Sequence, residues 1–374
     1  MTMNKRLIVS GAVIAAVSAS VLLAFQRGGP GGLPSQYTGN TTPLGSTDTS
    51  AADRACQGAT GHPRLLCLAD VLKKDLRRDL VARLQLAYSV ADAQRWSNFP
   101  PMVYRSRVGL TLGEFTPGQL GIVKAIMKEA AGIAASEGYD EIEQILNADD
   151  FLKNSNLGGG DLASGNYHIA FLGTPAATGT WQLYFGGHHL AFGTTYRDGV
   201  MAGATPSFRG VEPFTQFREN GRDNAPMAQE QAAFAAMLGG LTGDEQTKAR
   251  LGQTYTDIIV GPQKDGQFPS TRSGVRVGDL SQHKQDLVLR AIETYVHDID
   301  PPDAETILKK YRSELADTYV AYAGTPTMNA ENDYVRIDGP AVWIELSMQP
   351  GRSLPGIHPH SVWRDRTTDY GGSR

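Results

Sequence analysis

The chain has 374 residues, of which 41% are hydrophobic and 20% are charged, and its formal net charge at pH 7 is −4. This length is sufficient for one large domain or two smaller ones with a buried core. A nucleic-acid-binding protein is expected to carry a basic patch or stripe, so the slightly acidic composition argues against nucleic acid as a partner.

The first 25 residues have the pattern of an export signal. Lys5 and Arg6 precede an apolar run over 7–25, which is about as long as the roughly 20 residues that a membrane-spanning helix needs. The pattern fits a cleaved signal peptide and an uncleaved single-pass anchor equally well. Both predict an exported protein, periplasmic or extracellular, and the second tethers it to the inner membrane. This N-terminal segment is the only membrane contact that we expect.

Residues 26–52 are rich in Gly, Pro, Ser and Thr and contain almost no large apolar side chain. That composition predicts a flexible tether, followed by a single α+β domain over 53–374. Cys56 and Cys67 are the only cysteines of the chain. In an exported protein two cysteines this close predict a disulfide, and a two-thiolate metal site is the less favoured alternative.

Apolar residues at helical spacing predict that the N-terminal third of this domain is helical. One helix is expected over 70–87. Another begins after Thr116, with Pro117 in its first turn and Gln119 completing a capping box. Asp140 is expected to cap a third. Later helices are expected over 226–238, around 245–254, after Ser281 and after Asp303.

Between the helical parts the apolar period changes to two, which predicts short strands. They are expected at 167–172, 180–185, 190–195 and 199–202, and again from 334 onward. Strands, then helices, then strands predict an α+β fold. We expect the helical N-terminal part to pack on an antiparallel or mixed sheet, built from strands before and after the central helical block. A doubly wound parallel sheet would require regular βαβ alternation, which the sequence lacks.

A short internal repeat links the two strand-rich parts. Residues 169–175 resemble residues 320–326, and each is a strand followed by Gly-Thr-Pro. The same alignment places Gly187-His188-His189 opposite Gly339-Pro340-Ala341. Two such hairpins in one sheet would bring the histidines of both parts together.

Four of the eight histidines are candidate metal ligands: His188, His189, His358 and His360. The last two lie two residues apart, so in an extended chain both imidazoles project to the same side. Adjacent residues of a strand face opposite ways, so regular geometry lets only one of His188 and His189 join that site. The two glycines before them form a candidate bulge, so the sequence does not decide which one.

Glu345 and Glu212 are the carboxylates expected to act with these histidines, as catalytic base or as ligand. Imidazoles with a carboxylate make a nitrogen-rich set that suits zinc, copper or iron rather than calcium. Arg336 and Arg364 add cations, either as internal salt bridges or as clamps for an anionic substrate, and salt bridging is the favoured role. The alternative is a metal-free polar core in which neighbouring hydroxyls and carboxylates satisfy the histidines.

Several motifs taken together resemble one known family. They are Trp96-Ser97-Asn98-Phe99-Pro100, Arg107-x-Gly109-Leu110, Phe171-Leu172-Gly173-Thr174-Pro175, Gly187-His188-His189-Leu190, Thr205-Pro206-Ser207-Phe208, Tyr334-x-Arg336, Ile344-Glu345 and His358-x-His360-Ser361. Over nearly everything after the tether, the sequence resembles the domain of unknown function 3500 family, found in bacteria and fungi. The resemblance implies that Glu212, Glu345 and the four histidines form one set. The family's usual acidic residue before Gly-His-His is Gly186 here, which puts a carboxylate role at that place in doubt.

Two functions are open at this point, besides a structural protein of the cell envelope that has no functional site. The first is a zinc- or copper-dependent hydrolase or oxidase, in which the metal lowers the pKa of bound water or binds a redox substrate. The second is a non-enzymatic protein of the cell envelope that binds a metal ion or a small ligand. The expected partner in both cases is a metal ion or a small molecule. The sequence indicates neither the substrate nor the oligomeric state.

Overall fold

The computed structural model describes residues 42–157 and 162–372, which belong to one compact unit over 37–374. The predicted export signal over 1–25 and the tether up to residue 41 lie outside the described residues. Within the part of the chain that is described, no helix has the length and apolar character needed to cross a bilayer. The division into signal, tether and domain stays a prediction.

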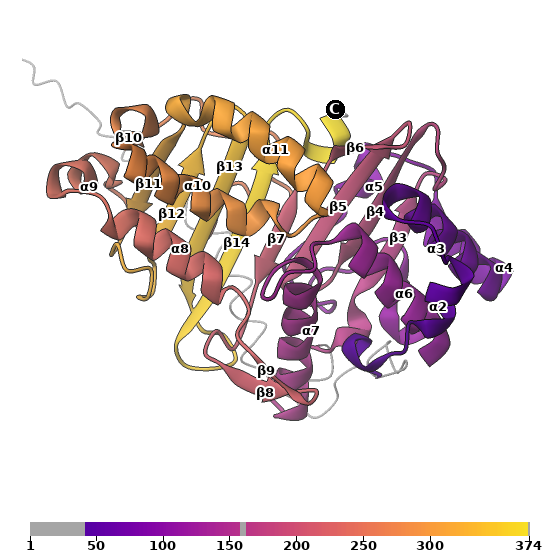
Figure 1. The fold of residues 1–374 in the computed structure, drawn as a ribbon. Coiled ribbons are helices and arrows are strands. Elements are labelled where there is room, and N and C mark those ends of the chain that lie inside the picture. Colours follow the sequence, from indigo (N-terminus) through magenta and orange to yellow (C-terminus); the bar gives the residue numbers. More distant parts are fainter. Residues whose placement is uncertain (1–41, 158–161, 373–374) are drawn as a thin grey trace, which may run out of the picture. The chain divides into compact units, whose positions relative to one another are not determined.

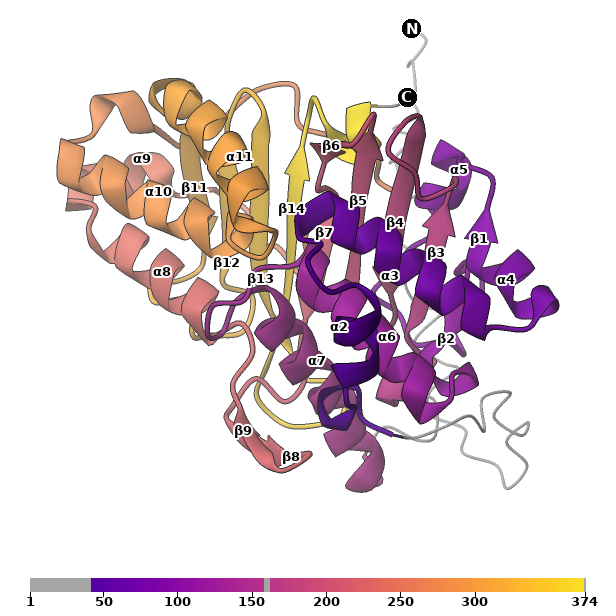
Figure 2. The same ribbon diagram turned by 45° about the vertical axis from the view of Figure 1, so that its right-hand side comes forward.

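A large and mostly antiparallel sheet forms the centre of the unit (Figure 1). Its strands are β1 (Gln85–Leu86), β2 (Leu110–Thr111), β3 (His168–Leu172), β4 (Thr180–Gly186), β5 (Leu190–Arg197), β6 (Val200–Gly203), β7 (Ser207–Gly210), β10 (Val275–Arg276), β11 (Tyr319–Ala323), β12 (Tyr334–Asp338), β13 (Val342–Pro350) and β14 (Ile357–Asp365). The order across the sheet is β1-β3-β4-β5-β7-β14-β13-β12-β11-β10, with β2 beside β3 and β6 beside β5 (Figure 2). β1 and β3 run parallel. Two short strands, β8 (Phe217–Glu219) and β9 (Arg222–Asn224), form a separate hairpin. The predicted α+β class is confirmed.

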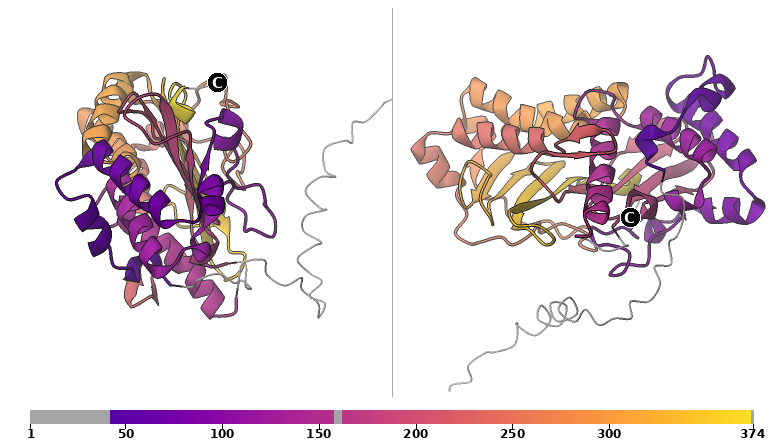
Figure 3. Two further views of the ribbon diagram at one scale, coloured as in Figure 1. Left: turned by 90° about the vertical axis from the view of Figure 1, so that its right-hand side faces the viewer. Right: turned by 90° about the horizontal axis from the view of Figure 1, so that it is seen from below.

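Helices cover one face of this sheet (Figure 3). They are α2 (Ser50–Ala55), α3 (Gly61–Asp75), α4 (Arg78–Leu84), α6 (Pro117–Ala130), α7 (Gly138–Asn154), α8 (Ala228–Gly239), α9 (Gly243–Ala249), α10 (Gln282–Val296) and α11 (Pro301–Glu314). The short helix α5 (Val90–Ala93) lies on the opposite face, where Ala93 packs with Tyr184 and Ala191. The apolar sides of α3, α6 and α7 pack against β3 and β4, and those of α8, α10 and α11 pack against β12 and β13. Each strand therefore presents one side chain to the helices and the next to the opposite face.

Side-chain caps mark the starts of α5, α6 and α9. α6 begins with the predicted capping box, in which Thr116 and Gln119 exchange side-chain and backbone hydrogen bonds. Two predicted starts are wrong by a few residues, because α7 begins at Gly138, before Asp140, and α11 begins at Pro301, before Asp303. The helix expected over 70–87 is two helices, because Leu76 adopts an extended conformation between α3 and α4. Apolar spacing continues across such a break and hides it.

The opposite face of the sheet is covered by two mostly irregular segments, of which the first contains the short helix α5. The first covering segment, residues 87–109, packs Trp96 and Val108 against Tyr184 and Phe208. The second covering segment, residues 250–274, packs Tyr255 against Tyr334, with ring centroids 4.0 Å apart. Polar side chains of β13 and β14, among them Glu345, Gln349 and Arg364, lie on this face and contact the second covering segment.

The short repeat seen in the sequence belongs to a larger structural duplication. We call residues 107–210 the first half and residues 272–365 the second half. Arg107 donates to the carbonyl of Gly187, and Arg272 donates to the carbonyl of Gly339. In each half that glycine closes the hairpin with a backbone hydrogen bond of 2.8 Å, to Leu190 in one and to Val342 in the other. The alignment of Gly187-His188-His189 with Gly339-Pro340-Ala341 is therefore confirmed.

Packed structure begins earlier than the composition of residues 26–52 suggests. Leu44–Ser46 form a 3-10 helix, Leu44 is buried in the core, and α2 begins at Ser50. Lys124 of α6 donates to the carbonyls of Gly45 and Thr47, which holds this stretch against the domain. Part of the stretch that the composition assigns to the tether is therefore packed against the domain. The predicted disulfide between Cys56 and Cys67 is present.

Candidate functional site

All four candidate histidines lie together at one end of the sheet, where the two halves meet. His188 and His189 form the turn between β4 and β5, and His358 and His360 belong to β14. β7 pairs with both β5 and β14, which brings the turn beside the beginning of β14. The site is therefore at the lower end of the sheet in Figure 1, where β5 and β14 begin.

Three imidazole nitrogens converge in this group. Nε2 of His358 lies 2.7 Å from Nε2 of His189 and 3.1 Å from Nε2 of His360. Around a tetrahedral ion with metal–nitrogen bonds of about 2.0–2.1 Å, neighbouring ligand nitrogens lie roughly 3.3 Å apart. The three side chains are thus arranged as a set that could hold a metal ion.

His188 and His189 both face this site, contrary to the expectation for adjacent residues of a strand. His189 adopts a left-handed backbone conformation, with φ of 62°, and the two rings stack with their centroids 3.6 Å apart. The turn leaves no room for a side chain at Gly187, because a Cβ there would lie 2.6 Å from the Tyr167 ring. Strand alternation does not apply inside a two-residue turn. Of the two residues, His189 is the one that belongs to the set of three ligand histidines.

His188 is held by a carboxylate that the sequence did not single out. Its Nδ1 lies 2.7 Å from Oδ1 of Asp149, a buried residue of α7. The hydroxyl of Tyr167 donates to the other oxygen of Asp149 at 3.0 Å and also contacts the carbonyl of His188. One signal in the sequence could have indicated a buried carboxylate. Asp149 and Asp150 lie next to the apolar residues Ala148 and Leu152 of the same helix, which are buried.

His360 also has partners that the sequence did not reveal. Its Nδ1 lies 3.1 Å from Oδ1 of Asp257 in the second covering segment and 2.5 Å from Nε2 of Gln349. Gln349 in turn donates to Asp257 at 2.6 Å. In the tautomer whose Nδ1 donates to Asp257, Nε2 carries the lone pair and faces the other two histidines.

The site is largely shielded from solvent. Exposed fractions are 2% for His189, 4% for His358 and 5% for His360, while His188 is the most exposed at 8%. Burial lowers the pKa of His189 and of His358 well below the ordinary value, and the neighbouring imidazoles lower it further. These two rings are therefore neutral at pH 7, which is the form that binds metals.

Glu345 lies on β13, but the structure does not bring its carboxylate into the group of ligand nitrogens. Its oxygens accept four hydrogen bonds, from the backbone N–H groups of Ile259 and Val260, the hydroxyl of Tyr334 and the indole of Trp343. The side chain is completely buried, and burial raises its pKa. Glu345 thus holds the second covering segment against the sheet. The first of the two backbone donors, Ile259, is two residues after Asp257.

Glu212 has a comparable position on the other side of the site. Its carboxylate accepts hydrogen bonds from the backbone N–H groups of Arg352, Ser353 and Leu354, at 2.8 to 3.0 Å. These residues form the loop between β13 and β14, immediately before His358. Glu212 therefore holds the loop that leads into the histidines rather than contacting them.

The two predicted arginines differ in their surroundings. Arg364 makes ion pairs with Asp265 and Asp369, as the favoured interpretation requires. Arg336 faces Glu345 across β12 and β13 and lies over the Trp343 ring, 5.6 Å from its centroid. Among the described residues no carboxylate forms an ion pair with Arg336, so salt bridging is not found there.

Comparison with known proteins assigns the chain to a family. No curated protein and no solved structure shows a significant match. The family described as protein of unknown function (DUF3500) matches residues 60–372. This match spans both halves of the sheet and all four histidines of the site. The chain therefore belongs to the DUF3500 family, as the resemblance of its motifs predicted.

Proposed function

We propose that the protein is a metal-dependent enzyme whose metal ion is held by Nε2 of His189, His358 and His360. The observation that carries the proposal is the convergence of these three nitrogens. Nε2 of His358 lies 2.7 Å from Nε2 of His189 and 3.1 Å from Nε2 of His360. Imidazole nitrogen is a preferred ligand of zinc and of copper, so both ions fit the set.

A metal-free polar core explains the geometry less well. Nε2 of His358 approaches both His189 and His360, yet one ring nitrogen offers either a single N–H or a single lone pair. It can therefore complete only one of the two hydrogen bonds. A cation accepts lone pairs from all three nitrogens at once, which removes the conflict.

The pair formed by His188 and Asp149 supports catalysis rather than storage. Three protein ligands leave a position open for water or substrate, and a zinc ion would lower the pKa of such a water to about 7. Asp149 holds Nδ1 of His188, so Nε2 of that ring is free to take up or deliver a proton beside the metal ligands. This arrangement suits the hydrolysis of a small molecule.

The two predicted glutamates, Glu345 and Glu212, do not contact the metal ion in this proposal but hold the segments that carry its ligands. Glu345 positions Asp257, which orients His360, and Glu212 positions the loop that precedes His358. Both are positioning residues, because their oxygens are already occupied by backbone N–H groups. Arg336 is separated from the histidines by Glu345 and is not part of the proposed chemistry.

A non-enzymatic metal binder is the second candidate, and the low exposure of the three ligand histidines favours it. The two candidates differ in turnover, whereas both require a bound ion. Export also belongs to the proposal, and the disulfide between Cys56 and Cys67 is compatible with an oxidising compartment.

The first experiment is elemental analysis of the purified full chain, followed by calorimetric titration of the metal-free protein with Zn²⁺ and with Cu²⁺. We expect one ion per chain in the wild type and none in the His358→Ala/His360→Ala variant. The matched control is His283→Ala/His297→Ala, two exposed histidines at the ends of α10. Failure of the wild type to bind either ion would overturn the metal centre. A bound ion without turnover of any ester, amide or phosphate ester in a broad screen would favour the binder.

A further inference from the structure

An exposed apolar turn lies beside the group of histidines. Phe99 is 48% exposed, Met102 55% and Val103 42%. These three are half of the six large apolar side chains that are exposed among the described residues, and they stand within one stretch of five residues. Apolar side chains scattered singly over a surface are ordinary, whereas a cluster of them is typical of a binding surface. We call residues 99–103 the apolar turn.

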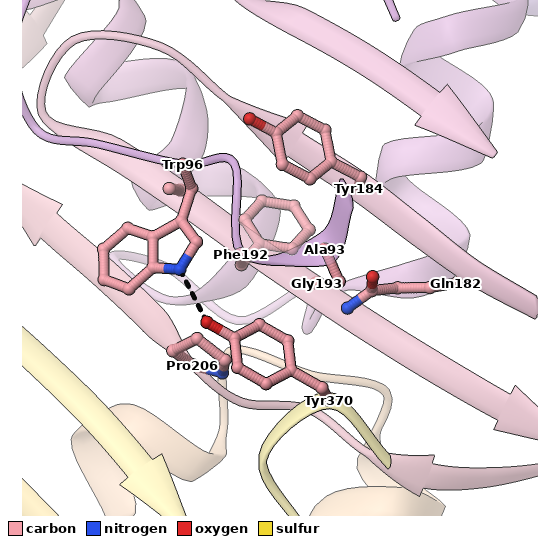
Figure 4. Close-up of a pocket in the computed structure, with 9 residues that line it drawn as sticks. Ala93, Trp96, Gln182, Tyr184, Phe192, Gly193, Pro206 and Tyr370 are labelled. Atoms are coloured by element: carbon pink, nitrogen blue, oxygen red, sulfur yellow. Dashed lines mark hydrogen bonds between the residues drawn. The ribbon is translucent and has the colours of Figure 1, made fainter. Parts of the chain in front are cut away.

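The backbone of the apolar turn has a fixed conformation. The N–H groups of Val103 and Tyr104 both donate to the carbonyl of Pro100 at 3.0 Å. Just before the turn, the indole of Trp96 donates to the hydroxyl of Tyr370 at 2.9 Å (Figure 4). The three apolar side chains are therefore presented to solvent by a turn that hydrogen bonds hold in place.

One buried arginine joins the apolar turn to the histidine pair. Arg107 is 7% exposed, and its guanidinium donates to the carbonyls of Phe99 and Tyr104, at the two ends of the turn. The same group donates at 2.8 Å to the carbonyl of Gly187, the residue immediately before His188. An arginine presents its donors in a rigid plane, so the turn and the histidine pair keep one position relative to each other.

The metal site and the apolar turn are also in direct contact. The backbone N–H of His189 donates to the carbonyl of Asn98 at 3.4 Å, so a proposed metal ligand contacts the residue that precedes the turn. A substrate at the open coordination position would thus have exposed apolar side chains within reach. Packing an apolar chain against them removes both surfaces from water, which favours binding.

From this arrangement we infer that the apolar turn binds an apolar chain of the substrate. The substrate class is then an ester or amide that carries such a chain. The inference rests on the proposed metal-dependent hydrolysis and adds the part of the protein that selects the substrate. The occupant is part of the substrate, because Arg107 and Asn98 hold the turn against the histidine pair itself.

Two hydroxamic acids are the probes, titrated by calorimetry into the full chain loaded with Zn²⁺. Acetohydroxamic acid and octanohydroxamic acid bind a metal ion through the same group and differ only in the length of the alkyl chain. We expect the octano compound to bind the wild type about tenfold more tightly, because its chain is buried on the apolar turn. This measurement does not depend on turnover.

The variant Phe99→Ser/Met102→Ser removes most of the apolar surface. Its affinity for octanohydroxamic acid should fall about tenfold, whereas its affinity for acetohydroxamic acid should be unchanged. Both replaced side chains are exposed, so this variant is expected to fold. The matched control is Ile133→Ser/Val200→Ser, which replaces two exposed apolar residues outside the first covering segment and should keep both affinities.

Zinc content measured on the same samples separates the inference from the proposed function. A wild type without zinc overturns the metal centre, and this inference with it. A zinc-loaded wild type that binds neither probe, or binds both equally well, overturns the inference alone. So does a Phe99→Ser/Met102→Ser variant that keeps the preference of the wild type, or a control variant that loses it.

Discussion

Nε2 of His358 lies 2.7 Å from Nε2 of His189, although 169 positions separate the two residues in the chain. One belongs to the turn of the first half and the other to a strand of the second half. The site therefore exists only when β7 and β14 pair at the centre of the sheet. In the second half Pro340 and Ala341 occupy the equivalent turn, so this end of the sheet alone carries the histidine pair.

Replacement of His188 should separate chemistry from metal binding. In His188→Ala the three convergent nitrogens stay in place, so the ion is expected to remain bound while kcat falls by about 10²–10⁴. Asp149→Asn should have a smaller effect, because the amide still lies beside Nδ1 of His188 but no longer holds the ring as firmly as the carboxylate does. Metal content and kcat are measured on the same samples, with His297→Ala as control. Loss of the ion in His188→Ala would instead identify His188 as a ligand.

Glu345→Gln tests whether the buried carboxylate acts through Asp257. We expect the free energy of unfolding to fall by about 1–3 kcal/mol, because charged acceptors of buried N–H groups are lost. We also expect weaker metal binding, because the segment that carries Asp257 is no longer fixed. Urea unfolding and metal titration give the two quantities, and Glu331→Gln is an exposed control.

The coupling is measured with the double variant Glu345→Gln/Asp257→Asn. If Glu345 positions Asp257, the losses in metal affinity are less than additive. Fully additive losses would show that the two carboxylates act separately.

The buried carboxylates around Arg209 should make the free energy of unfolding decrease as pH rises. Arg209 forms ion pairs with Glu141, Glu230 and Asp298, and these residues join β7 and α7 to the helices of the second half. Burial, together with the neighbouring carboxylates, raises the pKa of Glu230 to about 8 and that of Glu137 to about 9. The folded state therefore keeps protons that the unfolded state loses above pH about 4.5.

Unfolding consequently releases protons between about pH 4.5 and 9, and the free energy of unfolding decreases over that interval. Glu230→Gln mimics the protonated side chain, so it should flatten this dependence and raise the free energy of unfolding at pH 7 by about 1–3 kcal/mol. Urea unfolding at several pH values measures it, with Glu331→Gln as control. An unchanged pH dependence in Glu230→Gln would exclude Glu230 as its source.

Removal of the disulfide should destabilise the domain without affecting the site. Cys56 and Cys67 enclose a loop with a sequence separation of 11 and lie far from the histidines in the chain. Cys56→Ser/Cys67→Ser should lower the free energy of unfolding by roughly 2–3 kcal/mol in the chain-entropy account. Metal content should be unchanged. A loss of metal in this variant would mean that α3 supports the site in a way that its contacts do not show.

Several features of the site follow from local rules that the sequence carries. His358 and His360 share a face because side chains alternate along a strand. Gly187 and Gly339 occupy equivalent positions in the two halves, which follows from a repeat of a few residues. Local rules also produced errors. Glu345 stands between Ile344 and Leu346 in the sequence, and only the folded chain shows that backbone N–H groups occupy its oxygens.

The sequence by itself determined the α+β class, the capping box of α6, the disulfide and the set of four histidines. The capping box and the disulfide depend on residues close together in the chain, where spacing and side-chain type are sufficient. The tertiary structure decided that the rings of His188 and His189 stack on each other. It also decided the partners: Asp149 for His188, and Asp257 and Gln349 for His360. These contacts depend on a left-handed turn and on packing between distant segments. No local pattern encodes them, because the energy that selects them appears only when both halves of the sheet are formed.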